Sequence, residues 1–257
     1  MTLVVIPVFM REPPDFAVTL AAVESVHRTA SDQPRVLLVD DCSPARALVL
    51  ELAAERQRFG FELRRNKVNE GFSRSVNVGL RMALAEGEDA VLVNADVEIL
   101  TPGWDRIMRD QDAAVVGALL LYPGEQLIQH AGTFFSLLTR IWDHRFRFAP
   151  ATLPEALVPC RCPVTAAFQY IRHSTLEAVG VYDPEFRMAW EDVDYCLRVF
   201  DAGLDCLYAP EVRALHHESI FRGRADRHLD EWQSKGLARL TDKHRHTNFA
   251  QWVPELV

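Results

Sequence analysis

Two oxygen-bearing side chains, Asn94 and Asp96, follow an apolar run of the 257-residue chain. They stand two residues apart at the expected end of a strand, where an extended backbone points both side chains to the same side. Hard oxygen ligands of this kind suit Mg²⁺ or Mn²⁺, which commonly bridge to substrate phosphates. The spacing therefore indicates a divalent cation site, with the alternative that Asp96 only caps the following turn.

A second acidic group, Glu191-Asp192-Val193-Asp194, stands at the expected start of a helix. Acids in a first helical turn are ordinary partners of the helix dipole, and Glu191 and Asp194 stand a turn apart. The preceding Met188-Ala189-Trp190 is apolar and would lower the access of water to one of the carboxylates. One of these acids is therefore a candidate general base, and a capping role is the alternative.

A histidine pair, His216-His217, ends an expected strand and is soon followed by Arg222-Gly223-Arg224. A neutral imidazole could complete the shell of a metal, and the arginines could approach phosphate oxygens. Two surface histidines without a ligand are the alternative.

The elements that must position these groups alternate between strand and helix in the first half of the chain. Apolar runs predict strands, and apolar residues at helical spacing predict helices between them. The strands are Leu3–Phe9, Val36–Val39, Phe61–Arg64 and Ala90–Val93, and helices are expected from Phe16, over Pro44–Phe59, over Phe72–Ala85 and after the capping pair Thr101-Pro102. This order indicates a parallel sheet covered on both faces, whose ligands bind at the carboxyl ends of the strands. Those ends carry Pro7-Val8-Phe9, Asp40-Asp41 and Asn94-Ala95-Asp96.

The second half predicts a mixed extension of the sheet. Its expected strands are Val115–Leu121, Thr133–Phe135, Val164–Ile171, Leu204–Tyr208 and Val212–His216, with helices over Glu191–Ala202 and from Ala225. The irregular stretch from Trp142 to Pro159 is rich in arginines and aromatic residues, and it is either a loop over the site or an ordinary surface loop.

Composition and missing motifs exclude several function classes. With 28 Lys and Arg against 36 Asp and Glu, the net charge of -8 argues against a protein that grips nucleic-acid phosphates. No G-x-G, G-x-x-x-x-G-K, H-E-x-x-H or G-x-S-x-G occurs, which leaves dinucleotide binding, P-loops, zincins and nucleophile-elbow hydrolases without support. Five cysteines with a single C-x-C spacing fit a reducing cytoplasm better than structural zinc. Without a leader or an apolar run near ~20 residues, we expect a cytoplasmic protein.

Taken in chain order, several segments between residues 3 and 224 resemble the family-2 glycosyltransferases of the GT-A fold, in particular their rhamnosyltransferase-like bacterial members. The segments are Val5–Phe9, Val39–Ser43, Asn69–Phe72 with Asn77 and Gly79, Val93–Asp96, Gln129–Gly132, Glu191–Asp194 with Leu197-Arg198, and His216–Ser219 with Arg222-Gly223. The resemblance implies an α/β fold with a Rossmann-like, mostly parallel nucleotide-binding sheet and a mixed acceptor-side extension. It implies one domain over 1–257, with a nucleotide-sugar half at 1–112, an acceptor and catalytic half at 113–224 and a helical tail at 225–257.

The same likeness assigns roles to the candidate residues. The donor-binding set that it implies is Pro7, Val8, Phe9, Asp40, Asp41, Asn69, Gly71, Asn77, Asn94 and Arg222. Asn94-x-Asp96 matches the metal-binding D-x-D position with one acid fewer, and His216 matches a histidine that the family often adds to the metal or diphosphate. Asp192 matches the catalytic base and Glu191 its supporting neighbour. The implied cofactor is a divalent cation, Mg²⁺ or Mn²⁺.

The resemblance implies an inverting glycosyltransferase that moves a hexosyl or deoxyhexosyl group from a nucleoside-diphosphate sugar to a hydroxyl of a glycan or glycoconjugate, in surface polysaccharide synthesis. The cation neutralises the departing diphosphate while Asp192 takes the proton of the acceptor. A non-catalytic sugar-nucleotide-binding protein of the same fold is the first alternative. A sugar nucleotidyltransferase is the second, and the lack of a Gly-rich loop after Phe9 counts against it. We expect no nucleic-acid partner and at most peripheral contact with the inner face of the membrane.

Overall fold

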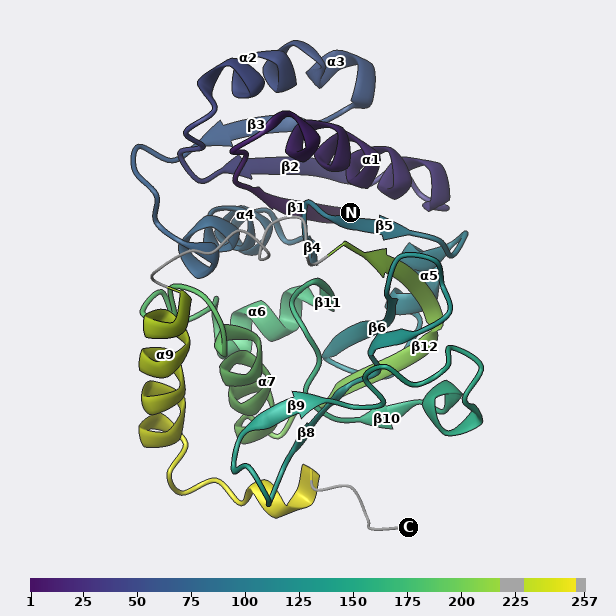
Figure 1. Ribbon diagram of the computed structural model, residues 1–257, viewed down its shortest axis with the longest axis vertical. Coiled ribbons are helices and arrows are strands. Elements are labelled where there is room, and N and C mark those ends of the chain that lie inside the picture. The colour runs from purple at the N-terminus through teal and green to yellow at the C-terminus, as the bar shows by residue number, and fades with distance from the viewer. Residues whose placement is uncertain (218–228, 253–257) are drawn as a thin grey trace.

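The computed structural model describes residues 1–217 and 229–252, and a large twisted sheet runs through this part of the chain (Figure 1). Its N-terminal part consists of β1 (Thr2–Val8), β2 (Arg35–Asp40), β3 (Glu62–Arg65) and β4 (Asp89–Val93). Strand β1 lies between β2 and β4 and β3 borders β2, with every pair parallel. The parallel sheet predicted for this half of the chain is therefore confirmed, each strand boundary lying within one or two residues of the predicted one.

The second half extends the sheet with mixed strand directions. Its strands are β5 (Val97–Ile99), β6 (Val115–Leu121), β7 (Ile128–His130), β10 (Cys160–Arg161), β11 (Phe168–Ile171) and β12 (Cys206–His216). Strand β11 is antiparallel to both β4 and β6, and β12 is parallel to β6. The order along the sheet is β10-β12-β6-β11-β4-β1-β2-β3, with β5 paired to β12 and β7 to β6. A separate hairpin is formed by β8 (Thr133–Phe135) and β9 (Trp142–His144).

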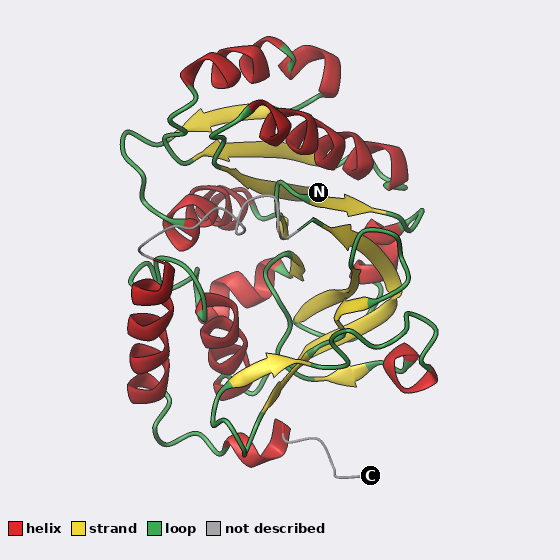
Figure 2. Cartoon of the chain, viewed as in Figure 1, coloured by secondary structure: helices red, strands yellow, loops and turns green. Residues whose placement is uncertain are grey.

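Helices cover both faces of the sheet (Figure 2). One face carries α1 (Pro13–Thr29), α2 (Arg46–Ala54), α3 (Arg56–Phe59) and α5 (Trp104–Arg109), and the other α4 (Phe72–Glu86), α6 (His173–Val179), α7 (Glu191–Asp201) and α9 (Leu229–Lys243). Successive residues of β1 belong to different cores: Leu3 and Val5 pack with α4, whereas Val4 and Ile6 pack with α1. This is why the strand is apolar at consecutive positions and does not alternate.

Strand β12 replaces two predicted strands. The residues between Ala209 and Arg213 form a bulge, because Ala209 pairs with Ala118 and Arg213 with Leu119, the next residue of β6. Pro210 lies in this bulge, where it breaks the apolar pattern without ending the strand. The strand thus continues to His216 and delivers it to the carboxyl end of the sheet.

Several other predicted boundaries were wrong. Thr101-Pro102 does not begin a helix: α5 begins at Trp104, after Gly103 in a left-handed conformation with φ of 75°. The Thr101 hydroxyl oxygen instead accepts a hydrogen bond from the N–H of Arg213 at 2.8 Å. The predicted helix over Pro44–Phe59 is divided into α2 and α3, and the predicted strand from Val164 begins only at Phe168. The stretch after Trp142, expected to be irregular, contains β9 and the 3-10 helix η1 (Pro154–Leu157).

The last described helix, α9, packs beside α7 (Figure 1). Its residues Lys243 and Arg239 form ion pairs with Asp183, both at 2.9 Å or less, and Lys243 also pairs with Asp194 at 2.7 Å. The predicted start of this helix near Ala225 lies outside the described residues. After α9, the 3-10 helix η2 (Phe249–Trp252) packs Phe249 and Trp252 against Trp142 of the hairpin.

Candidate active site

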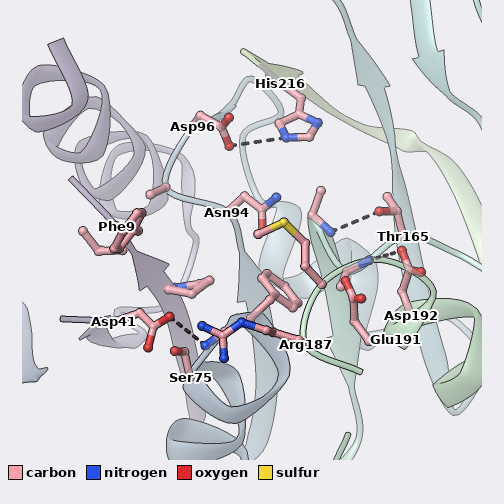
Figure 3. A pocket seen from close by; sticks show the side chains of 18 of the residues that line it. Phe9, Asp41, Ser75, Asn94, Asp96, Thr165, Arg187, Glu191, Asp192 and His216 are labelled. Carbon is pink, nitrogen blue, oxygen red and sulfur yellow. Dashed lines mark hydrogen bonds and ion pairs between the residues drawn. The ribbon is translucent and has the colours of Figure 1, made fainter. Parts of the chain in front are cut away.

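A cavity of about 290 Å³ lies at the carboxyl ends of the parallel strands (Figure 3). Most of the residues singled out from the sequence line it: Pro7, Val8, Phe9, Asp41, Asn69, Gly71, Asn94, Asp96, Glu191, Asp192 and His216. Figure 3 separates three of its sides, with Asp96 and His216 on one, Asp41 on a second, and Glu191 and Asp192 on a third. The cavity therefore joins groups from both halves of the chain.

Asp41 holds the loop that forms one wall. Its Oδ1 accepts hydrogen bonds from the N–H of Glu70 at 2.7 Å and from the side-chain amide of Asn66 at 2.9 Å, and its Oδ2 accepts from the N–H of Gly71 at 2.8 Å. The side-chain amide of Asn69 donates to the carbonyl oxygen of Asp41 at 3.2 Å. These bonds fix the wall formed by Asn69 and Gly71 opposite the Pro7–Phe9 segment.

Two predicted donor-binding residues do not line the cavity. Asp40 is fully buried, and its carboxylate accepts hydrogen bonds from the N–H of Ser43 at 3.1 Å and from Arg65. Asn77 exchanges two hydrogen bonds with the backbone of Tyr182, at 2.8 and 2.9 Å. Both residues thus support the walls from behind. A third, Arg222, lies outside the described residues.

Asp96 and His216 meet because β5 and β12 are antiparallel neighbours. His216 stands opposite Val97, which places its Nε2 3.3 Å from the Oδ1 of Asp96. The amide of Gln129 orients the ring: its Nε2 donates to the carbonyl oxygen of His216 at 3.2 Å, so its Oε1 accepts the proton of His216 Nδ1 at 2.5 Å. With the proton on Nδ1, a neutral His216 presents the lone pair of Nε2 toward a carboxylate oxygen.

This arrangement fits a divalent cation. Two lone pairs that face each other repel unless a cation or a proton lies between them, and an imidazole held at its other nitrogen by an amide is the usual form of a metal-bound histidine. The buried Oδ1 of Asn94, two residues from Asp96, has no hydrogen-bond partner among the described residues. No group of three or more His, Cys, Asp or Glu side chains in the described ranges could hold a metal by itself. Asp96, His216 and Asn94 would therefore share the cation with substrate phosphates and water, as is common for Mg²⁺ and Mn²⁺.

Asp192 is directed into the cavity by backbone contacts. Its Oδ2 accepts the N–H of Ala166 at 3.3 Å and its Oδ1 that of Val193 at 2.8 Å. Ala189 and Trp190, the two residues before Glu191, both have left-handed backbones, with φ of 72° and 70°. Such a pair is rare for residues other than glycine and turns the chain abruptly into α7.

The third acid of this group, Asp194, faces away from the cavity. It is fully buried and bonds to Arg198 at 3.0 Å, Lys243 at 2.7 Å and His244 at 2.9 Å. Burial raises the pKa of Asp194, but the hydrogen bonds from His244 and Lys243 outweigh this effect and hold the pKa below its ordinary value. Asp194 therefore anchors α9, and Glu191 and Asp192 are the acids that remain at the cavity.

A histidine pair lines the wall beside Asp192. The N–H of Thr165 donates to Nε2 of His130 at 3.4 Å, so the proton of His130 lies on Nδ1, which contacts Nδ1 of His144 at 2.7 Å. Burial lowers the pKa of His130 well below its ordinary value, because a charged ring would lose its hydration. His130 is thus a neutral link that orients His144.

Five residues that line the cavity were given no role from the sequence: Gln129, His130, His144, Arg187 and Trp232. Gln129 and His130 belong to a segment quoted for the family resemblance, and the other three do not. Arg187 lies in the loop four residues before Glu191, the first residue of α7, and its nearness to the acids in the sequence could have suggested it. Trp232 could not have been found, because only the packing of α9 brings it to the cavity.

A family model described as "Glycosyl transferase family 2" matches residues 3–171. The chain belongs to this family. Among curated relatives of this glycosyltransferase chain, the uncharacterized protein y4gI of Sinorhizobium fredii is 31% identical over 220 residues, covering 80% of the chain and 24% of the relative. The O-antigen biosynthesis protein RfbC of Myxococcus xanthus is 32% identical over 173 residues, covering 60% and 13%.

A third relative is the N-acetylglucosaminyl-diphospho-decaprenol L-rhamnosyltransferase of Mycobacterium tuberculosis, 30% identical over 142 residues, with 54% of this chain and 45% of the relative covered. The chain thus spans less than half the length of each of these three relatives.

Solved structures share the fold. GalNAc-T7 with UDP, GalNAc and Mn²⁺ has a TM-score of 0.68 at 17% identity, covering 94% of this chain and 47% of that one. The mannosyltransferase PcManGT from Pyrobaculum calidifontis, in complex with GDP-Man and Mn²⁺, has a TM-score of 0.60 at 15% identity, covering 96% and 64%. The GT-A fold predicted from the sequence is therefore confirmed. In the described part of the chain, no helix combines the length and the apolar character that crossing a membrane requires.

Proposed function

We propose that this chain is an inverting glycosyltransferase that moves a sugar from a nucleoside-diphosphate sugar to an acceptor hydroxyl. The observation that carries the proposal is that one cavity holds a cation-type pair, Asp96 and His216, on one side and the oriented carboxylate of Asp192 on another. This pairing suits a reaction in which a diphosphate leaves while a hydroxyl loses its proton.

The nucleoside would bind between the Pro7–Phe9 segment and Asp41. Val8 is buried and apolar, Phe9 offers an aromatic ring, and Asp41 offers acceptor oxygens beside them, its N–H donating to the carbonyl oxygen of Val8 at 2.8 Å. A flat base between an apolar segment and a carboxylate gains both burial and hydrogen bonding. Asn69 and Gly71 stand on the same wall, so they complete the proposed donor site.

The diphosphate would lie toward Asp96, His216 and Asn94, which would hold the cation. When bound, Mg²⁺ or Mn²⁺ supplies positive charge that stabilises the departing nucleoside diphosphate. Gln129 keeps His216 in the tautomer that leaves Nε2 open, and Asn94 adds a neutral oxygen in place of a second carboxylate. Relatives of the same fold that were solved with Mn²⁺ support the choice of a divalent cation, but Mg²⁺ serves the same chemistry.

Asp192 would accept the proton of the acceptor hydroxyl. It stands in the first turn of α7 and lines the cavity. Ala166 N–H holds the carboxylate in place, and Glu191 lines the cavity beside it. A hydroxyl activated at Asp192 attacks the sugar carbon on the face opposite the leaving diphosphate, so the configuration at that carbon inverts.

The acceptor is proposed to be a glycan or glycoconjugate of a surface polysaccharide. Support comes from the names of two relatives, an O-antigen biosynthesis protein and a rhamnosyltransferase. His144 and Thr165, on the wall beside Asp192, are the polar groups that would meet such an acceptor.

The test is the release of free nucleoside diphosphate from UDP-, GDP- and dTDP-sugars, in Mn²⁺ and in excess chelator. We expect slow release from one donor class in Mn²⁺, with water as the acceptor, and a large loss in chelator. Binding of a donor without any release, with or without candidate glycans, would favour a non-catalytic binding protein. Release of pyrophosphate from a nucleoside triphosphate and a sugar phosphate would instead show a nucleotidyltransferase.

A further inference from the structure

The cavity contains a positively charged side chain, Arg187, that has no role in the proposed reaction. Arg187 lines it between Asn69 and the start of α7, and Figure 3 shows its side chain between Asp41 and Glu191. Its Nη2 donates to the carbonyl oxygen of Asn69 at 2.9 Å and also to the side-chain oxygen of the same residue. Its guanidinium carbon lies 5.0 Å from the centre of the Trp232 ring. All of these partners are electrically neutral.

The backbone of Arg187 is held as firmly as its side chain. Its carbonyl oxygen accepts the N–H of Phe72, the first residue of α4, at 2.8 Å. Gly71 lies directly against it: a Cβ at Gly71 would stand 2.6 Å from both the carbonyl oxygen and the Cγ of Arg187. Gly71 also has a φ of 87°, which disfavours other residues. The close approach therefore fixes Arg187 on the donor side of the cavity.

The surroundings of Arg187 favour an anionic ligand. The cavity is lined by five carboxylates, those of Asp15, Asp41, Asp96, Glu191 and Asp192. In the described part of the chain no ion pair joins Arg187 to any of them, and Asp41 already accepts hydrogen bonds from Asn66, Glu70 and Gly71. The guanidinium carries five N–H donors, and the contacts with Asn69 use only those of Nη2. Donors remain on Nε and Nη1 in a pocket that is lined by five carboxylates and, besides Arg187, by one further arginine, Arg11.

We infer that Arg187, stacked on Trp232, binds a phosphate of the donor's diphosphate, on the side away from Asp96 and His216. This inference rests on the proposed function, because it takes the ligand to be a nucleoside diphosphate. A guanidinium offers a planar fork of N–H donors that matches two phosphate oxygens. The neutral Asn94 leaves the cation side with one carboxylate, and Arg187 supplies positive charge from the other side.

The inference is tested by calorimetry with a ligand series. Of UDP, GDP and dTDP, the one that the wild-type protein binds most tightly is chosen, together with its nucleoside monophosphate and its nucleoside. We expect Arg187→Gln to weaken binding of the diphosphate by about 10–100-fold, the usual loss of a charge-assisted hydrogen bond, and to leave nucleoside binding unchanged. The loss should persist in excess chelator, because Arg187 acts apart from the cation. Arg187→Lys, which keeps the charge but not the fork, should recover part of the affinity.

Two further variants separate binding from structure. Arg74→Gln removes the same charge from an exposed arginine of α4 that pairs with Glu185 at 3.3 Å and does not line the cavity, and its diphosphate affinity should equal that of the wild type. Trp232→Leu should weaken diphosphate binding by less than Arg187→Gln does. Trp232→Phe, which keeps an aromatic ring, should have a diphosphate affinity near that of the wild type.

Each unfavourable outcome has a distinct meaning. Unchanged diphosphate affinity in Arg187→Gln, or an equal loss for the nucleoside, would overturn the inference about Arg187 and leave the proposed function standing. Failure of the wild-type protein to bind any of the three diphosphates would contradict the proposed function itself.

Discussion

Asp192 and Asp194 lie two positions apart on α7 and have opposite surroundings. Asp192 faces the cavity and is oriented by N–H groups of Ala166 and Val193. Asp194 is fully buried between Arg198, Lys243 and His244. The difference follows from helix geometry, because positions two apart point to different sides of a helix. The same residue type therefore lines the cavity at one position, where we propose a catalytic role, and anchors α9 at the other.

Replacing Asp192 with Asn tests its role as the general base. The amide keeps the size and most of the hydrogen bonding but cannot accept the proton, so we expect donor affinity near the wild-type value and turnover lower by ~10²–10⁴-fold. Donor affinity is measured by calorimetry and turnover by release of nucleoside diphosphate. In the matched variant Asp194→Asn, the melting temperature should fall instead. Near-normal turnover in Asp192→Asn would dismiss this residue as the base.

Gln129 is expected to control the affinity for the cation through His216. Gln129→Leu removes the acceptor that holds the His216 proton on Nδ1, so either tautomer and other ring orientations become available. We expect Mn²⁺ affinity in the presence of saturating nucleoside diphosphate to fall by ~10–100-fold, measured from the free Mn²⁺ signal in electron paramagnetic resonance. Gln126→Leu, at an exposed position in the turn before β7, is the control. Equal Mn²⁺ affinity in all three proteins would contradict this role.

The cavity residues that could be predicted from the sequence are those that belong to a short, recognisable segment. Asn94, Asp96 and the acids at Glu191 could be found because they follow an apolar strand or open a helix. Asp40 and Asn77 carry the same chemical signals but support the walls, and only the packing around Ser43 and Tyr182 distinguishes them. The metal, base and donor assignments themselves stay predictions.

Helix α4 packs on β1 through Gly79. A Cβ at this position would stand 2.3 Å from Cγ2 of the fully buried Val5. Alanine gains about 1 kcal/mol over glycine in a helix interior, but overpacking a core costs typically 1–3 kcal/mol, and a stiff β-branched neighbour in a strand cannot move away. We expect Gly79→Ala to lower the melting temperature by several degrees in thermal unfolding. Arg81→Ala, at an exposed position of the same helix, should leave it nearly unchanged, and a raised melting temperature in Gly79→Ala would refute the close contact.

The attachment of α9 should depend on pH through Asp183. Partial burial raises the pKa of Asp183, but hydrogen bonds from Lys243 and Arg239 outweigh it and lower the pKa to about 2. Since an unfolded Asp has a pKa of ~3.9, the stabilisation is complete above that value and is lost as the pH falls through ~4 to ~2. The melting temperature of Asp183→Asn should therefore lie below that of the wild type at pH 6, with the gap closing toward pH 2. Glu185→Gln, at an exposed position, is the control, and a gap independent of pH would argue against these ion pairs.

Element types were more predictable than their ends. The strands β1 to β4 could be recognised because both faces are covered and their residues are apolar at consecutive positions. The bulge near Pro210 and the start of α5 could not, because they lie where distant segments meet, as the bond between Thr101 and Arg213 shows. The positive φ values of Ala189 and Trp190 also leave no trace in the sequence, since neither residue is a glycine.

For the whole molecule, the sheet order explains why the cavity collects residues from distant segments. Antiparallel β11 lies between the parallel N-terminal strands and the β6–β12 pair, so it joins the two halves of the chain that line the cavity. The pairing of β5 with β12, which brings Asp96 to His216, joins segments far apart in the chain. Such pairings are fixed by the complete sheet and not by local propensity, so the sequence placed Asp96 and His216 together only through the family resemblance.

In the proposed reaction, a hydroxyl activated at Asp192 displaces the nucleoside diphosphate from the sugar in one step. The most direct measurement is the anomeric configuration of the sugar first released from the preferred donor, followed by proton nuclear magnetic resonance before the anomers equilibrate. Inversion at a single carbon predicts that an α-linked donor first yields the β-sugar, or a β-linked donor the α-sugar. First release of the sugar with the configuration of the donor would contradict the account.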